Sequence, residues 1–118
     1  MTAQYDVSVE DIEYLKAGEA SLLARLYRPK GDGPFPGVVE VHGGAWIGND
    51  RLTNVDIDQA LAASGVVVMA VDFRMPPAAQ YPEPVADINF AIRWLRANAE
   101  RFDVDPAKIG LLGTSRAD

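Results

Sequence analysis

The chain has 118 residues, a length suited to one domain with a modest core. Hydrophobic residues make up 48% and charged residues 24%, as is ordinary for a globular protein. The formal net charge is −6 and no Lys/Arg cluster offsets it, which argues against a nucleic-acid partner. Because cysteine is absent, disulfides and thiolate metal sites are excluded.

The N-terminal residues lack the basic and apolar stretches of a signal peptide. The longest apolar run, Val66–Val71, is too short to span a membrane. We therefore expect a cytoplasmic protein that does not associate with membranes.

The first part of the chain predicts two antiparallel strands, Val7–Leu15 and Ala20–Arg28, joined at residues 17–19. The second strand alternates, as expected for a half-exposed pair: its apolar set is Leu22, Ala24 and Leu26, and its opposite set is Ser21, Arg25 and Tyr27. A turn-rich loop with three prolines and three glycines follows over residues 29–37.

Three short apolar runs then predict strands of another kind: Val38–Val41, Val66–Val71 and Ile109–Leu112. These runs are mostly apolar over successive residues, which is typical of parallel strands buried on both faces.

Two helical stretches separate the apolar runs. The first, Val55–Ser64, is followed by Gly65, a natural helix stop. The second, Glu83–Phe102, has Pro84 in its first turn, where a missing N–H costs little. Its apolar residues recur at three- and four-residue steps and predict one buried face: Val85, Ile88, Ile92, Leu95, Ala99 and Phe102.

The predicted order is β-β-β-α-β-α-β, an α/β sheet with an antiparallel start. Ligands bind such sheets at the carboxyl ends of the strands. Three loops leave those ends here: "HGGAW" after Val41, "DFRMPPAAQYPEP" after Val71 and "GTSRAD" after Leu112. We expect them to converge on one edge, which is the main clue to function.

The loop "VHGGAWIGND" carries two glycines after a strand, Gly43 and Gly44. Without Cβ atoms, their N–H groups can approach a ligand oxygen and stabilise a developing oxyanion. A bare Gly-Gly can also be no more than a tight turn. His42 is the only histidine, and its position beside the glycines favours a scaffold for the loop over a general base.

The segment "GLLGTS" places Ser115 at a strand-to-turn junction. Gly113 and Ser115 match the first positions of the nucleophile elbow G-x-S-x-G, whose glycines relieve crowding around a strained nucleophile. Arg116 follows the serine, and Ala117 stands where the closing glycine is expected.

Several acidic residues along the chain could be mistaken for catalytic groups. Asp72 and Arg74 could pair and fix their loop, and Asp87 lies on the helix that follows. "DVDP" at residues 103–106 has two acids with metal-like spacing but no third ligand, which favours a helix-to-strand turn. We expect structural roles for all of them and no metal site.

Together, "VHGGAW" and the segment from "VDFRMPP" to "GLLGTS" resemble the bacterial hormone-sensitive-lipase-like esterases of the α/β-hydrolase superfamily, from residue 37 to Ser115. The order of the motifs carries this resemblance. It implies an eight-stranded sheet, a Ser–Asp–His triad and an oxyanion hole, and hydrolysis of carboxylic esters with short acyl chains. No cofactor is implied.

Carried onto this sequence, the resemblance implies that Ser115 is the nucleophile. Gly43, Gly44 and the backbone N–H of Arg116 then form the oxyanion hole, with His42 as scaffold of the glycine loop. The same resemblance implies two residues that line the acyl or alcohol pocket: Trp46 and Tyr81.

This chain departs from the family at its end. Members read Ser-Ala-Gly-Gly or Ser-Ser-Gly-Gly at the elbow, whereas this chain reads Ser-Arg-Ala-Asp. The family's acid and histidine come later than the serine, so neither is present. We therefore expect residues 1–118 to be the N-terminal portion of one α/β-hydrolase domain without N-terminal cap helices. A second chain or segment would supply the remaining strands, the Asp and the His.

Other functions remain open at this point. An amidase such as an arylformamidase uses the same framework, and plant hormone receptors of similar fold are binding modules without catalysis. An independent small α/β domain is the third alternative, against which the joint spacing of the three loops argues.

Overall fold

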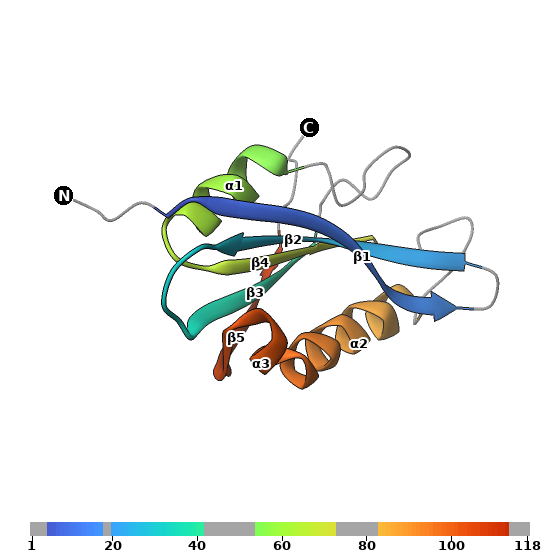
Figure 1. Ribbon diagram of the computed structural model, residues 1–118. Helices are drawn as coiled ribbons and strands as arrows, with labels where there is room; N and C mark the ends of the chain where they lie inside the picture. Colours follow the sequence, from blue (N-terminus) through green and yellow to red (C-terminus); the bar gives the residue numbers. More distant parts are fainter. Residues whose placement is uncertain (1–4, 18–19, 42–53, 73–82, 114–118) are drawn as a thin grey trace.

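The computed structural model describes residues 5–17, 20–41, 54–72 and 83–113. Within these residues the chain forms a five-stranded sheet with helices on both faces (Figure 1). The elements in chain order are β1 (Val7–Ala17), β2 (Ala20–Pro29), β3 (Phe35–Val41), α1 (Val55–Ala63), β4 (Val67–Val71), α2 (Glu83–Ala97), α3 (Ala99–Phe102) and β5 (Val104–Gly113).

The strands lie in the order β1-β2-β4-β3-β5. β2 is antiparallel to both β1 and β4, whereas β3 is parallel to β4 and to β5. Parallel neighbours need a crossover connection, and here α1 joins β3 to β4 while α2 and α3 join β4 to β5. The predicted α/β sheet with an antiparallel start is confirmed.

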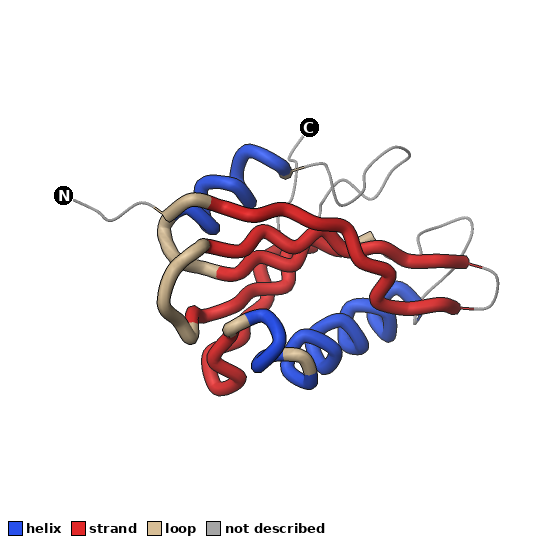
Figure 2. The backbone as a smooth tube through the Cα atoms, viewed as in Figure 1, coloured by secondary structure: helices blue, strands red, loops and turns tan. Residues whose placement is uncertain are grey.

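The helices lie on opposite faces of the sheet (Figure 2), and each face buries its own core. Under α2 and α3 lies the larger one, with Val39, Met69, Leu95 and Phe102 among its buried members. Under α1 lies a smaller one of Tyr27, Ala62, Val68 and Ala70. β4 lies between both layers, and all five of its residues are buried, as predicted for a parallel strand covered on both faces.

Two burial predictions were wrong. Tyr27 was assigned to the more exposed side of β2, but it is 1% exposed because α1 covers that face. Ile109–Leu112 was predicted to be buried on both faces, but most of β5 is exposed and Leu111 is 57% exposed. β5 is the last strand of the sheet, and no described element lies beyond its outer edge.

The end of α1 shows why the glycine prediction held. Gly65 has a φ of 109°, a conformation that L side chains rarely adopt. Its N–H donates to the carbonyl of Ala62 (3.0 Å), and the N–H of Val66 donates to that of Leu61 (3.3 Å). These are the two hydrogen bonds of a Schellman motif, which satisfies the last carbonyls of the helix.

The helix predicted over Glu83–Phe102 is divided at Asn98 into α2 and α3. The Asn98 side-chain amide donates to the carbonyl of Trp94 (2.8 Å), and this oxygen also accepts from the backbone N–H of Asn98 (3.0 Å). The helix-to-strand turn predicted at 103–106 is confirmed at Asp103, which lies in the left-handed region at φ 61°, whereas residues 104–106 already belong to β5. The Asp103 carboxylate accepts from the N–H of Gly33 (3.0 Å).

Candidate active site

The carboxyl ends of the three parallel strands lie level with one another. Val41 of β3 pairs with Val71 of β4 on one side and with Gly113 of β5 on the other. Because these strands run in the same direction, residues 42, 72 and 114 all follow from one edge of the sheet, which we name the carboxyl rim. The predicted convergence is confirmed for the strand ends from which the three loops leave.

The predicted site residues themselves lie outside the described residues: His42, Gly43, Gly44, Trp46, Tyr81, Ser115 and Arg116. Arg74, the expected partner of Asp72, also lies outside them. Their roles therefore stay predictions, and the structure locates the points at which the chain leaves and rejoins the sheet around them.

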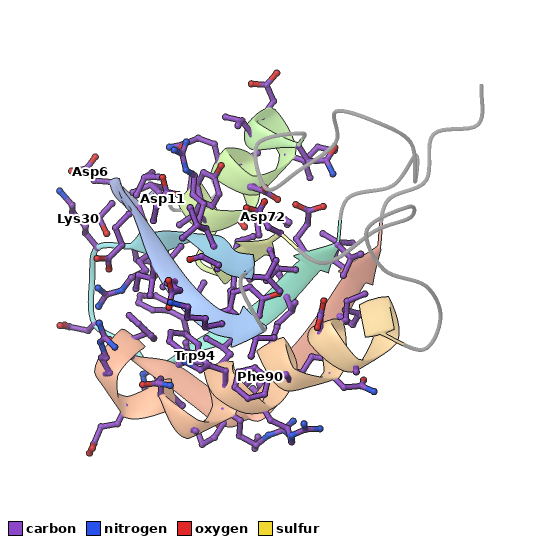
Figure 3. The ribbon with its side chains drawn as sticks, turned by 90° about the vertical axis from the view of Figure 1, so that its right-hand side faces the viewer. Asp6, Asp11, Lys30, Asp72, Phe90 and Trp94 are labelled. Carbon is purple, nitrogen blue, oxygen red and sulfur yellow. The ribbon has the colours of Figure 1, made fainter. Side chains whose placement is uncertain are left out.

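The exit of β4 is held by the antiparallel strands. The N–H of Asp72, labelled in Figure 3, donates to the carbonyl of Leu23 in β2 (2.8 Å). The carbonyl of Asp72 accepts from the hydroxyl of Tyr14 in β1 (2.5 Å). Tyr14 is 3% exposed, and its ring lies 6.4 Å from that of Phe90 on α2. The pair β1–β2 therefore fixes the position at which the second loop begins.

The exit of β3 carries a buried polar group that the sequence interpretation missed. Glu40 is 1% exposed, and the side-chain amide of Asn54 donates to its Oε2 (2.7 Å). Asn54 directly precedes α1, and Glu40 lies one residue before the end of β3, so this hydrogen bond joins the chain on the two sides of the glycine loop. The sequence did contain a signal for this buried group, because Glu40 is a charged residue inside the otherwise apolar run Val38–Val41.

Asp58 on α1 is a second missed acid, and it is fully buried. It lies one helical turn before Ala62, which is also buried, so it belongs to the inward face of α1. Burial raises the pKa of Asp58 to about 8, and the negative charge of Glu40 beside it adds to the rise.

Other titratable groups lie on β1 and β2, which pack against α1. Burial raises the pKa of Tyr27, and the charge of Asp58 adds to that rise. Arg25 donates to both carboxylate oxygens of Asp11 (2.9 and 3.0 Å), which raises the pKa of Arg25. This bidentate pair joins β2 to β1 and occupies the guanidinium of Arg25.

Among the described residues no group of three or more His, Cys, Asp or Glu side chains is placed to hold a metal ion. Glu40 and Asp58 supply only two carboxyl groups. No helix in the described ranges is long and apolar enough to cross a membrane.

Comparison with known proteins gives the family. The family model described as BD-FAE matches residues 25–117. A versiconal hemiacetal acetate esterase of Dothistroma septosporum is 32% identical over 108 residues, which are 90% of this chain and 33% of that protein. An esterase of Pyrobaculum calidifontis, solved in a monoclinic form, superposes with a TM-score of 0.83 at 34% identity, over 96% of this chain and 37% of that one.

The thermophilic esterase Est2 of the Planctomycetes species Thermogutta terrifontis, solved with butyrate bound, superposes with a TM-score of 0.82 at 30% identity. That match covers 91% of this chain and 40% of Est2. The chain thus spans between a third and two fifths of these three proteins. The resemblance to the esterases is confirmed: the chain belongs to the BD-FAE family, and its sheet is the N-terminal part of an α/β-hydrolase fold.

Proposed function

We propose that the protein containing this chain is a serine carboxylesterase in which Ser115 attacks the carbonyl carbon of a short-chain ester. The observation that carries this proposal is the carboxyl rim: Val41, Val71 and Gly113 end level with one another, and the glycine loop and the serine segment follow directly. The matched relatives are named as esterases, which favours esters over the amides that an arylformamidase cleaves. They also favour an enzyme over a binding module without catalysis.

The proposed reaction is acyl transfer. Ser115 Oγ bonds to the carbonyl carbon while a histidine from outside this chain takes its proton. The negative oxygen is stabilised by the N–H groups of Gly43, Gly44 and Arg116. The alcohol leaves with the proton from the histidine, and water then releases the acid from the serine by the same steps. No cofactor takes part.

Trp46 and Tyr81 are proposed to line the acyl or alcohol pocket, with His42 as scaffold of the glycine loop. The butyrate bound to Est2 supports a short acyl chain. The cytoplasmic location stays a prediction.

The Asp and His of the triad must come from a further segment or chain, and β5 is where we propose that it packs. Leu111 is 57% exposed there, and a Cβ added at Gly110 or Gly113 would meet no atom within 4 Å. A strand laid along β5 would pair its free backbone groups and cover its apolar side chains. The fraction of the relatives that the chain spans supports this completion.

A fluorophosphonate probe tests the nucleophile. The full-length protein is treated with the probe, and the adduct is located by mass spectrometry. We expect labelling at Ser115, lost in Ser115→Ala and kept in Ser64→Ala, a control that removes an exposed hydroxyl just past the end of α1. Labelling elsewhere, or none in a folded sample, would refute the proposal. Turnover of p-nitrophenyl butyrate against its matched anilide then separates esterase from amidase.

A further inference from the structure

Two side chains, Glu40 and Asn54, are hydrogen-bonded across the two ends of the glycine loop, residues 42–53, and the buried Asp58 lies beside Glu40. We name Glu40, Asn54 and Asp58 the acid cluster. Glu40 lies one residue before the end of β3, and Asn54 directly precedes α1. Their hydrogen bond of 2.7 Å spans the chain on either side of residues 42–53. The cluster therefore lies where the chain leaves β3 to enter the loop that carries the proposed oxyanion donors.

Asp58 lacks a donor in this arrangement. Its side chain is fully buried, and neither carboxylate oxygen accepts a hydrogen bond from any group in the described part of the chain. The buried hydroxyl of Tyr27 is likewise without a partner among those residues. A buried ionised carboxylate without donors is costly, and a second carboxylate beside it adds repulsion.

A single proton removes both costs. A carboxylic acid has one O–H donor, which an ionised carboxylate lacks. If Asp58 is protonated, its O–H can donate to Glu40, whose Oε2 already accepts from Asn54. The pair then carries one negative charge in place of two, and that charge is held by two hydrogen bonds.

The elements packed against α1 supply no better partner. β2 presents Tyr27 and Arg25, and Arg25 is engaged by Asp11 of β1 at 2.9 Å. β4, Val67–Val71, has no titratable side chain, and β3 presents Glu40 itself. Glu40 and Tyr27 are the two described groups beside Asp58, and of these only Glu40 is a carboxylate to which a protonated Asp58 can donate.

We propose that Asp58 is kept protonated, donates to Glu40, and with Asn54 forms a positioning cluster that holds together the two ends of the glycine loop. Its consequence for catalysis rests on the proposed function, because the loop carries the proposed oxyanion donors. The three residues are positioning residues, since none of them is proposed to touch the substrate.

The proton is expected to be present at neutral pH and lost in mild alkali, since burial raises the pKa of Asp58 to about 8. Above that pH two ionised carboxylates face each other, and the cluster no longer holds the loop ends in one position. A displacement of catalytic groups by about 1 Å costs up to about 100-fold in rate. We therefore expect the kcat of the wild-type enzyme to fall on the order of tenfold as the pH passes through about 8, with little change in KM.

The first experiment needs no activity. Infrared spectra of the full-length protein are recorded from about pH 6 to about pH 10, a range that brackets the value for Asp58. We expect a protonated-carboxyl band that disappears at the alkaline end and is absent from Asp58→Asn at every pH. Asp56→Asn, an exposed acid in the first turn of α1, is the matched control and should keep the band. A neutral-pH spectrum in which Asp58→Asn removes no band would overturn the proposal.

Hydrogen exchange tests the positioning role, again without substrate. At each pH the exchange of peptides within residues 42–53 is compared between the wild type and Asp58→Asn, so that the intrinsic pH dependence cancels. We expect faster exchange in the wild type only at the alkaline end, because the asparagine amide keeps a donor toward Glu40. Asn54→Ala should exchange faster at every pH. Equal exchange in all three proteins would refute the positioning role.

Turnover of p-nitrophenyl butyrate then links the cluster to catalysis. The alkaline fall in kcat should be absent from Asp58→Asn and present in Asp56→Asn, which a purely structural role would not produce. An identical alkaline fall in Asp58→Asn would overturn the catalytic consequence. An inactive wild type would instead refute the proposed function, and the infrared and exchange results would still decide the protonated pair.

Discussion

Substitution of Asp58 by asparagine should stabilise the protein, by an amount that grows with pH. The pKa of Asp58 rises from an ordinary 3.8 to about 8 on folding. Between these values the folded state binds one more proton than the unfolded state, so stability falls as the pH rises. The slope for one proton is about 1.4 kcal/mol per pH unit, and below pH 4 the effect vanishes.

Asparagine has a similar shape, keeps a donor toward Glu40 and has no charge to bury. The free energy of unfolding of Asp58→Asn should therefore exceed that of the wild type by at most about 4 kcal/mol at pH 7. This difference should grow until about pH 8 and stay constant at higher pH. Relaxation of the site lowers this ceiling without changing its sign.

Urea unfolding of the full-length protein at several pH values measures the difference, with Asp56→Asn as control. The exposed Asp56 should give a difference within about 0.5 kcal/mol that does not follow pH. A stability difference for Asp58→Asn that is independent of pH, or that shrinks as the pH rises, would refute the reasoning about the acid cluster.

Other substitutions test the fold. Leu95→Ala, at a fully buried position, should lower the free energy of unfolding by about 2–5 kcal/mol in urea. Gly65→Ala should cost about 1 kcal/mol or more by the same measurement, since the φ of 109° strains any side chain. Asp11→Ala should cost less than about 1 kcal/mol because its pair with Arg25 is partly exposed, and added salt should shrink this cost. Residues 1–118 alone should be oligomeric or partly unfolded, since the β5 edge around Leu111 is uncovered; a monodisperse, cooperatively melting monomer in sedimentation and calorimetry would contradict this.

Much of the fold could be predicted from local patterns. The alternation in β2 and the apolar runs of β3 and β4 depend on neighbouring residues, so they located these strands along the chain, although β3 begins at Phe35 within the stretch predicted as a loop. Gly65 marked the end of α1 because its conformation is a property of one residue. The level strand ends at the carboxyl rim followed from the parallel order.

The sequence missed what depends on contacts between distant residues. The predicted helix Glu83–Phe102 is divided at Asn98, whose side-chain amide folds back onto the carbonyl of Trp94. Tyr27 became buried because α1 lies over β2, which no pattern within β2 can report.

The sequence by itself determined the order of the elements, the family motifs and the edge at which the strands end. Tertiary structure alone decided that Glu40 of β3 and Asp58 of α1 share one buried site. Periodicity can assign each acid to an inward face, but it cannot show which two faces meet. The pKa of Asp58 depends on this contact between α1 and β3. Both the desolvation of its carboxyl group and the neighbouring charge of Glu40 arise from elements that only folding brings together.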